Sequence, residues 1–241
     1  MNKIRVVAVI LQYYSERIQN IPRIISDLKN SSRPPDRIIV FNNNPEVKIE
    51  DYIQDKDVVC VKTTHGFGTR SKYEGCLLDF ADYYLLIDDD ITVSKKTIEH
   101  LISIIPNDGK LFCTAQQGMI MDGKLLHERI TITDSQIIEP TPTETLIGSF
   151  IFCSFDAVVK MLSEERRCRE IVRSHGLDDL LGDDLLMGFA NAPIVIYPAK
   201  EDEKIIDLPD GGQCANLYFR EGQMTDQRDK IAELMKEMFN K

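Results

Sequence analysis

Three consecutive aspartates, Asp88-Asp89-Asp90, are the strongest chemical signal in the sequence. They directly follow the apolar run Leu85-Leu86-Ile87, which is typical of a buried strand. Crowded carboxylates that lose hydration repel one another, and a hard divalent cation such as Mn²⁺ or Mg²⁺ is the simplest compensation. We expect Asp88 and Asp90 to bind that ion. Such an ion also binds two phosphates of a nucleotide diphosphate and neutralises charge on the departing group, with Asp88 and Asp89 beside the nucleotide.

A second acidic pair, Asp183-Asp184, follows Gly182 and opens the apolar segment 185–190. Acidic residues are favoured at the start of a helix, so helix capping explains the pair as well as catalysis does. In the functional interpretation Asp184, with Asp183 next to it, faces an acceptor hydroxyl or the transferred sugar. Arg228 begins the last predicted helix, which is an ordinary place for a solvated arginine.

Further polar residues lie close to the ends of the predicted strands. Arg70 and Lys72 belong to the predicted helix before the aspartates, and one helical turn can aim both toward a diphosphate. Amide and aromatic groups that end the first two strands suit a uracil ring and its ribose, although turn chemistry explains the asparagines almost as well. These residues are Gln12 and Tyr13 after the first strand, and Asn42 and Asn43 after the second.

The elements that would hold these residues alternate between strands and helices. Near-continuous apolar runs predict buried strands over 4–11, 37–41, 58–61 and 83–87. Helical spacing of apolar residues predicts helices over about 18–28, 69–81, 94–106 and 225–239, with another helical stretch from residue 156. Residues 111–155 are rich in Thr and Ile and predict antiparallel strands. The pattern indicates an α/β fold with a doubly wound mixed sheet flanked by helices, whose strand ends collect the ligand.

Composition limits the function further. The 241 residues suit a single domain, which we divide into a nucleotide-binding half (1–92) and an acceptor-binding half (93–241). A formal net charge of −10 argues against nucleic acid as a partner. No apolar run approaches the roughly 18 residues of a membrane span, and the N-terminus runs into a strand without a cleavable signal, so we expect a cytoplasmic protein.

The cysteines and histidines give no metal-binding pattern. The six cysteines lack CxxC spacing and mostly lie among apolar residues, such as Cys60 between two valines, so we expect most to be buried free thiols. The four histidines, at positions 65, 100, 127 and 175, show no ligand spacing either.

Taken together, these motifs resemble those of GT-A-fold glycosyltransferases, and more narrowly the exostosin-like family (glycosyltransferase family 64), which transfers hexosamine or uronic acid from UDP-sugars. The similarity extends from about residue 5 to residue 238, with the motifs in the same order. They are Val9–Tyr13 with Arg17, Arg37–Asn43, Arg70 with Lys72, Leu86–Asp90, Leu146–Phe152, Gly182–Phe189, and Gln227-Arg228.

The resemblance implies a metal-dependent transfer from a UDP-sugar to a glycan or lipid-linked sugar, with retention of the anomeric configuration. Asp88 would contact the ribose or sugar, Asp90 the metal and Arg70 the diphosphate, while Asp184 and Arg228 would flank the reacting centre. The family's acceptor region carries a tryptophan, which this chain lacks, so Tyr218 or Phe219 would replace it.

Two alternatives remain open at this point. The broader glycosyltransferase family 2 has the same fold but inverts the anomeric centre, and Asp184 would then be the general base. Asp88-Asp89-Asp90-Ile91-Thr92 also fits the D-x-D-x-T motif of haloacid-dehalogenase-like phosphatases, in which Asp88 would be a phosphoryl nucleophile. Against that alternative, two strand–helix units precede the motif, whereas the nucleophile strand of those phosphatases normally comes first.

Overall fold

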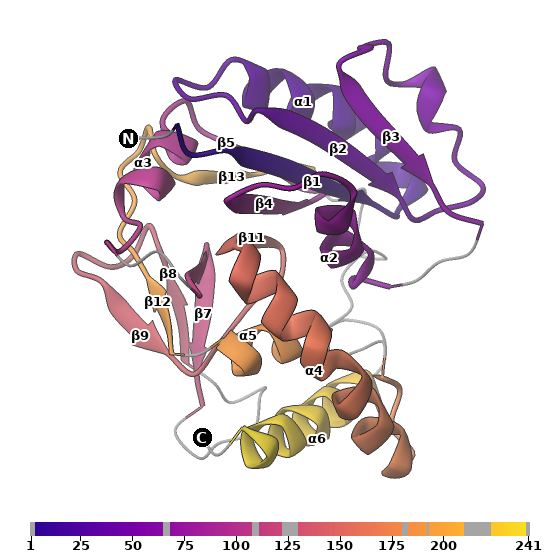
Figure 1. The fold of residues 1–241 in the computed structure, drawn as a ribbon, viewed down its shortest axis with the longest axis vertical. Coiled ribbons are helices and arrows are strands. Elements are labelled where there is room, and N and C mark those ends of the chain that lie inside the picture. The colour runs from indigo at the N-terminus through magenta and orange to yellow at the C-terminus, as the bar shows by residue number, and fades with distance from the viewer. Residues whose placement is uncertain are drawn as a thin grey trace.

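A six-stranded mixed sheet forms the centre of the molecule, with strand order β3-β2-β1-β4-β11-β6 (Figure 1). The computed structural model describes residues 3–64, 68–107, 111–121, 130–179, 183–191, 193–209 and 223–239. The first four strands of the sheet are parallel, whereas β11 runs antiparallel to both β4 and β6. The strands are β1 (Val6–Gln12), β2 (Arg37–Asn42), β3 (Val58–Lys62), β4 (Tyr83–Asp88), β6 (Cys113–Ala115) and β11 (Phe150–Ser154).

Alternating side chains of the central strands build one core on each face of the sheet. Val6, Ala8 and Ile10 of β1 belong to the core that includes the buried side of α1. Val7 and Val9 belong to the opposite core, which continues into α2, α4, α5 and α6. Because β1 is buried on both faces, its sequence has to be apolar at every position, which explains the continuous hydrophobic run.

Six α-helices flank the sheet in the part of the chain that the structure describes. The long helix α4 begins directly after β11, where Ser154 Oγ accepts a hydrogen bond from the Ala157 amide at 3.2 Å. Helices α4, α5 and α6 lie together on one side of the sheet, away from α1 (Figure 1). The helices are α1 (Ile21–Lys29), α2 (Ser71–Gly75), α3 (Thr97–Ser103), α4 (Phe155–Ser174), α5 (Asp183–Asn191) and α6 (Gln223–Met238).

Three small antiparallel sheets complete the fold of the described residues. One has the order β10-β7-β8 and the others pair β12 with β9 and β13 with β5. The β13–β5 pair matters most here, because it brings residues 205–207 against the segment that follows the aspartates. These strands are β5 (Ile91–Val93), β7 (Gln117–Ile120), β8 (Ile130–Thr133), β9 (Thr141–Thr143), β10 (Thr145–Leu146), β12 (Ile194–Ile196) and β13 (Ile205–Asp207).

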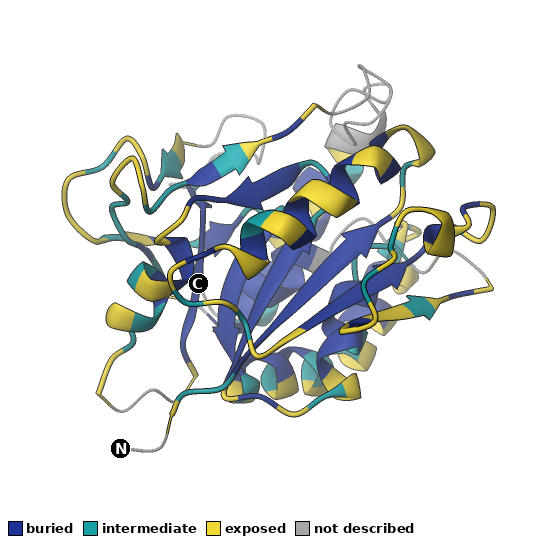
Figure 2. Ribbon diagram, turned by 90° about the horizontal axis from the view of Figure 1, so that it is seen from above, coloured by how far each residue is buried: buried dark blue, intermediate teal, exposed yellow. Residues whose placement is uncertain are grey.

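Most elements agree with the prediction, and two details differ. The helix expected over 69–81 is only α2, extended by one 3₁₀ turn over Cys76–Leu78. Cys60 is exposed, because β3 is an edge strand whose outer face is not covered, whereas Cys76, Cys113, Cys153 and Cys168 are buried free thiols as predicted. Figure 2 shows the buried central strands and the exposed outer faces of the helices. Across the described residues, no helix has both the length and the apolar character needed to cross a membrane.

Candidate active site

The predicted polar residues meet at one edge of the sheet. Because β1, β2 and β4 are parallel, their carboxyl ends align: Gln12 is in register with Asn42, and Leu11 with Asp88. The three aspartates therefore lie next to the ends of the first two strands, at the edge where ligands bind in open α/β sheets. Asp88 ends β4, and its amide donates to the Ser149 carbonyl at 2.9 Å, which connects this edge to the start of β11.

Asp89 is turned inward and holds the end of β1. Its Oδ2 accepts hydrogen bonds from the backbone amides of Tyr13 (2.9 Å) and Tyr14 (3.2 Å). Its Oδ1 accepts from Arg17 Nη1 at 3.1 Å, and the residue is only 3% exposed. Both oxygens of Asp89 thus have internal partners, which differs from the predicted contact with the nucleotide. Asp89 fixes the turn after β1.

Asp88 is paired with a buried lysine. Lys72 Nζ lies 2.7 Å from Asp88 Oδ1 and 2.5 Å from the Gly148 carbonyl oxygen, and the lysine side chain is 1% exposed. Burial raises the pKa of Asp88 to about 7, against the lowering effect of Lys72. Lys72 was predicted to neutralise a diphosphate, but in the structure it neutralises Asp88.

Asp90 combines a salt bridge with an unpartnered oxygen. Its Oδ2 lies 2.9 Å from Arg17 Nη1, so Arg17 bridges Asp89 and Asp90. Its Oδ1 is buried without a hydrogen-bond partner among the described residues. Burial raises the pKa of Asp90, an effect that the nearby Arg17 charge opposes. A carboxylate oxygen in this state is a ready ligand for a cation.

The carboxylate oxygens of Asp88 and Asp90 at this edge suit a hard cation that is also bound by the phosphates of the substrate. Within the described ranges, no group of three or more His, Cys, Asp or Glu residues could enclose a metal ion. Asp90 Oδ1 and the second oxygen of Asp88 are carboxylate ligands, the type that Mg²⁺ and Mn²⁺ prefer. Mg²⁺ commonly binds through one or two carboxylates plus substrate phosphates, so two aspartates fit such an ion.

Asp184 and Arg228 form a second buried pair. Arg228 Nη1 lies 3.2 Å from Asp184 Oδ1 and Nη2 lies 2.8 Å from Oδ2, a forked arrangement of two parallel bonds. Asp184 is 8% and Arg228 4% exposed, so Arg228 is not the solvated arginine of the alternative interpretation. Asp184 lies in the first turn of α5, where a carboxylate also favours the helix start. The pair joins the start of α5 to α6 across 44 residues. The side chain of Asp183 lies outside the described part of the chain.

Gly148 connects the two charged centres. Its carbonyl oxygen accepts from Lys72, and its α-carbon faces Asp184 so closely that an added Cβ would lie 2.4 Å from Asp184 Cβ. Only glycine permits this approach, because real Cβ atoms do not come so near. The Lys72–Asp88 pair and the Asp184–Arg228 pair are therefore separated by a single residue of backbone.

The residues predicted to contact the nucleotide base have different environments. Tyr13 is 43% exposed and available to a ligand. Gln12 is fully buried, with Nε2 bonded to the Tyr14 carbonyl at 3.0 Å and Oε1 without a partner among the described residues. Asn42 and Asn43 are also fully buried, and their side-chain amides donate to the carbonyls of Val47 and Gly68. The asparagines thus shape the turns, as the alternative interpretation held.

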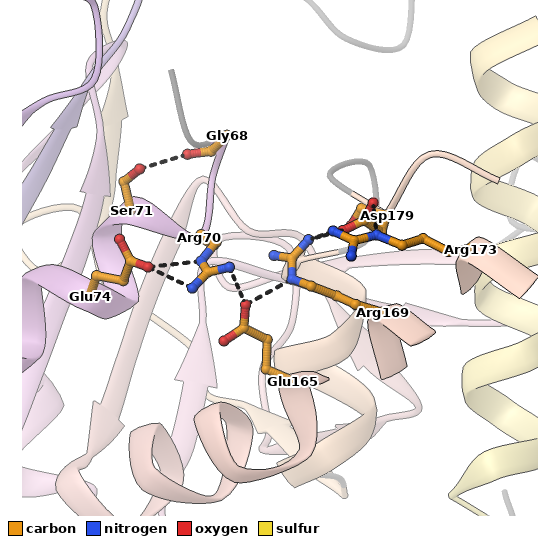
Figure 3. A network of polar contacts seen from close by, with 8 residues as sticks. All are labelled: Gly68, Arg70, Ser71, Glu74, Glu165, Arg169, Arg173 and Asp179. Atoms are coloured by element: carbon orange, nitrogen blue, oxygen red, sulfur yellow. Dashed lines mark hydrogen bonds and ion pairs between the residues drawn. The ribbon is translucent and has the colours of Figure 1, made fainter. Parts of the chain in front are cut away.

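Arg70 has two carboxylate partners instead of an open position. Its guanidinium contacts Glu74 Oε1 at 2.7 Å and Glu165 Oε1 at 2.5 Å (Figure 3). Glu165 belongs to α4, so this contact joins residues 1–92 to residues 93–241. A diphosphate would have to compete with both carboxylates for Arg70, and the predicted phosphate contact is not the arrangement seen.

A hollow of about 450 Å³ opens beside Asp90. This volume lies within the roughly 300–1,000 Å³ typical of ligand sites. Two hydrogen bonds hold its rim: the Leu208 amide donates to the Asp90 carbonyl at 2.6 Å, and Asn20 Nδ2 donates to the Pro209 carbonyl at 2.9 Å. Among the described residues its lining has no basic side chain. The lining residues are Asp90, Ile91, Gln116, Gln117, Ser149, Asp207, Leu208 and Pro209.

No sequence motif indicates four residues of the site, because contacts between distant segments bring them there. These residues are Asn20, Gln116, Gln117 and Asp207. Arg17 was noted only as part of the first-strand motif. Tyr218 and Phe219, expected to replace the missing tryptophan, lie outside the described residues, as do His65 and His127.

Comparison with known proteins agrees with this geometry. Residues 8–161 match the family described as glycosyl transferase family 2. The crystal structure of S. aureus TarS has a TM-score of 0.53 and 10% identity, over 86% of this chain and 37% of that one. S. aureus TarS 1-349 in complex with UDP-GlcNAc has a TM-score of 0.55 and 12% identity, over 96% of this chain and 65% of that one. No curated protein matches the sequence.

The two solved structures share the fold, and this chain spans less than two thirds of the length of either. The expected GT-A architecture and the glycosyltransferase class are confirmed, whereas the family found is the broader one, not the exostosin-like family. The match covers well over half of the residues and includes the three aspartates. The chain therefore belongs to glycosyl transferase family 2.

Proposed function

We propose that this protein is a metal-dependent glycosyltransferase that takes a sugar from a UDP-sugar and transfers it to a hydroxyl of a glycan or lipid-linked sugar. The observation that carries this proposal is Asp90 Oδ1, which is buried at the end of the parallel strands with no hydrogen-bond partner among the described residues, next to a polar hollow. A similar fold binding UDP-GlcNAc supports the choice of donor.

Asp90 and Asp88 would hold Mn²⁺ or Mg²⁺ together with the diphosphate. When bound, the ion acts as a Lewis acid that neutralises charge on the leaving diphosphate. Arg17 and Lys72 hold the two aspartates in place and remove part of their mutual repulsion before the substrate arrives. Exposed Tyr13 is the residue we assign to the uracil ring, with buried Gln12 behind it.

We assign the hollow beside Asp90 to the transferred sugar. Its carboxylates, amides and hydroxyl can bond several sugar hydroxyls, in keeping with a hexose or hexosamine. Asp90 is paired with Arg17, which leaves Asp207 as the carboxylate of the hollow that disfavours a negatively charged uronic acid, because like charges repel. Residues 93–241 would then bind the acceptor, and residues 1–92 the nucleotide.

The anomeric outcome depends on the role of Asp184. The exostosin-like resemblance implies retention, but membership in family 2 supports inversion with Asp184 as the general base that takes the proton of the acceptor hydroxyl. Both oxygens of Asp184 accept from Arg228, so the hydroxyl would have to replace one of these bonds. We propose inversion; a product that keeps the donor's anomeric configuration by ¹H NMR would exclude it.

The phosphatase alternative has little support. The family match runs through Asp88, and Lys72 occupies one oxygen of the carboxylate that would attack phosphorus. The proposed sugar transfer predicts donor hydrolysis, whereas the alternative predicts phosphate release from monoesters.

Two experiments test the proposed function. In the first, the protein is incubated with UDP-, GDP- and dTDP-sugars and Mn²⁺, and nucleotide release is measured without acceptor. UDP release from one sugar is expected, and phosphate release from monoesters alone would overturn the proposal. In the second, calorimetry compares UDP binding by wild type, Asp90→Ala and the exposed control Asp57→Asn. We expect Asp90→Ala alone to abolish the Mn²⁺-dependent part of UDP affinity, and full-strength binding in EDTA would contradict a metal site.

A further inference from the structure

Figure 3 shows a chain of alternating charges that joins residues beside α2 to helix α4 and to Asp179. It runs from Glu74 and Arg70 on the α2 side to Glu165 and Arg169 on α4, and ends at Asp179. Arg173 of α4 also binds Asp179, with Nε 2.9 Å from Oδ1 and Nη2 2.8 Å from Oδ2. We call these six residues the Arg169 network.

Arg169 is the central residue of the network. Its Nε donates to Glu165 Oε1 at 2.7 Å, and its Nη1 donates to Asp179 Oδ2 at 2.7 Å and to the Asp179 carbonyl at 3.0 Å. Its side chain is 10% exposed, and those of Glu165 and Asp179 are 14% and 12% exposed. Contacts of a guanidinium with both a side chain and the backbone of one residue fix that residue's orientation, which a single solvated ion pair does not.

The turn that Arg169 holds leads directly to the second charged centre. Asp179 precedes Asp184 by five residues. The amide of the neighbouring Asp178 donates to Gln227 Oε1 at 3.0 Å, and Gln227 is adjacent to Arg228 on α6. Residues 178 and 179 are thus fixed from α4 on one side and from α6 on the other.

We propose that Arg169 and Asp179 are positioning residues that set the geometry of the Asp184–Arg228 pair. Through the hydrogen bond from Asp178 to Gln227, the network holds residues 178 and 179 against α6 next to Arg228, so that the guanidinium meets the Asp184 carboxylate in the forked arrangement. This inference rests on the proposed function, because it concerns turnover by that pair.

The test is a double-mutant cycle on donor turnover. Asp179→Asn keeps the side-chain shape and removes the charge that Arg169 binds. We expect it to lower kcat about tenfold while changing UDP affinity less than twofold, because the effect reaches the sugar and not the nucleotide. Arg166→Gln is the matched control: it removes an arginine of the same helix from a pair with Glu170, and its side chain is 90% exposed. That variant should keep wild-type turnover.

Combination with Arg228→Ala separates positioning from a purely structural role. If Asp179 acts through the pair, Asp179→Asn should lower kcat less than twofold further in the Arg228→Ala background. An undiminished tenfold effect there, or wild-type kcat in the single variant, would overturn the proposal. If Asp179→Asn does not fold, as judged by thermal unfolding, the combined variant Arg169→Gln with Arg173→Gln, which removes both arginines that bind Asp179, replaces it in the same cycle with the same expectations. Failure of the proposed function would be distinct, because wild type itself would then release no UDP.

Discussion

The buried Lys72–Asp88 pair allows a quantitative prediction. Lys72→Met keeps most of the side-chain volume and removes the charge, which leaves the Asp88 carboxylate without its 2.7 Å partner and the Gly148 carbonyl without its donor. Breaking a fully buried pair by removing one partner destabilises by about 3–5 kcal/mol. The Asp88 side chain is 25% exposed, so solvent screening favours the lower end, about 3 kcal/mol. For a chain of this size that corresponds to a fall in Tm of roughly 6–12 °C.

The sign of the pH dependence follows from the pKa of Asp88. Burial raises this pKa to about 7, and Lys72 opposes the increase. Without Lys72 the pKa of Asp88 rises further. At low pH the Lys72→Met variant can therefore protonate Asp88 and avoid part of its loss of stability. The destabilisation should therefore be larger at pH 8 than at pH 6.

Urea unfolding of four proteins at both pH values measures this prediction. They are wild type, Lys72→Met, Asp88→Asn and the double variant, with the exposed Lys56→Met as control. Each single variant leaves one buried charge uncompensated, whereas the double variant removes both charges and should be more stable than either. If Lys72→Met unfolds at the wild-type urea concentration, or if the double variant is no more stable than the single ones, the pair does not hold this edge of the sheet.

Three further predictions concern other parts of the molecule. Gly148→Ala should lower donor turnover more than tenfold in a folded protein, since its Cβ would lie 2.4 Å from Asp184 Cβ; wild-type rates would refute the close approach. Burial raises the pKa of Asp134 to about 6, and a pKa raised by folding contributes stability at acid pH that is lost as the pH rises through 6. Asp134→Asn should therefore be more stable than wild type at pH 8, by up to about 3 kcal/mol in urea unfolding, with no gain at pH 4. UDP-N-acetylglucosamine should bind more tightly than UDP-glucuronic acid in calorimetry, and the reverse order would exclude the acidic hollow as the sugar site.

Sequence pattern was sufficient for the parallel part of the fold. The strands over 37–41, 58–61 and 83–87 are found within one residue of their predicted ends. The strands β2 and β4 are almost entirely buried and therefore apolar, whereas the edge strand β3 was found from its valines although most of it is exposed. The helix expected over 69–81 was too long. Its apolar residues Leu77, Leu78 and Phe80 are exposed and do not pack on the sheet, so apolar content there does not indicate a helix.

The site could be predicted only in part, because its geometry depends on contacts between distant segments. The run of aspartates identified its position, but which aspartate faces inward depends on Arg17, 72 residues away from Asp89 in sequence. Lysines and arginines are mostly solvated, so nothing local indicated that Lys72 would be fully buried. Likewise, Asp184 and Arg228 are 44 residues apart, and a single sequence does not show that they pair.

The position of β11 has a consequence for how substrates enter and leave. This strand comes from the segment proposed to bind the acceptor (93–241), yet it lies between β4 and β6 and is hydrogen-bonded to β4 from Phe150 to Ser154. A rigid-body hinge between the halves would have to break that ladder, next to the aspartates themselves. We therefore expect that any movement that admits substrate or releases product occurs in the segments around the site. The sheet then keeps β4 and β11 at a fixed separation during substrate binding and product release.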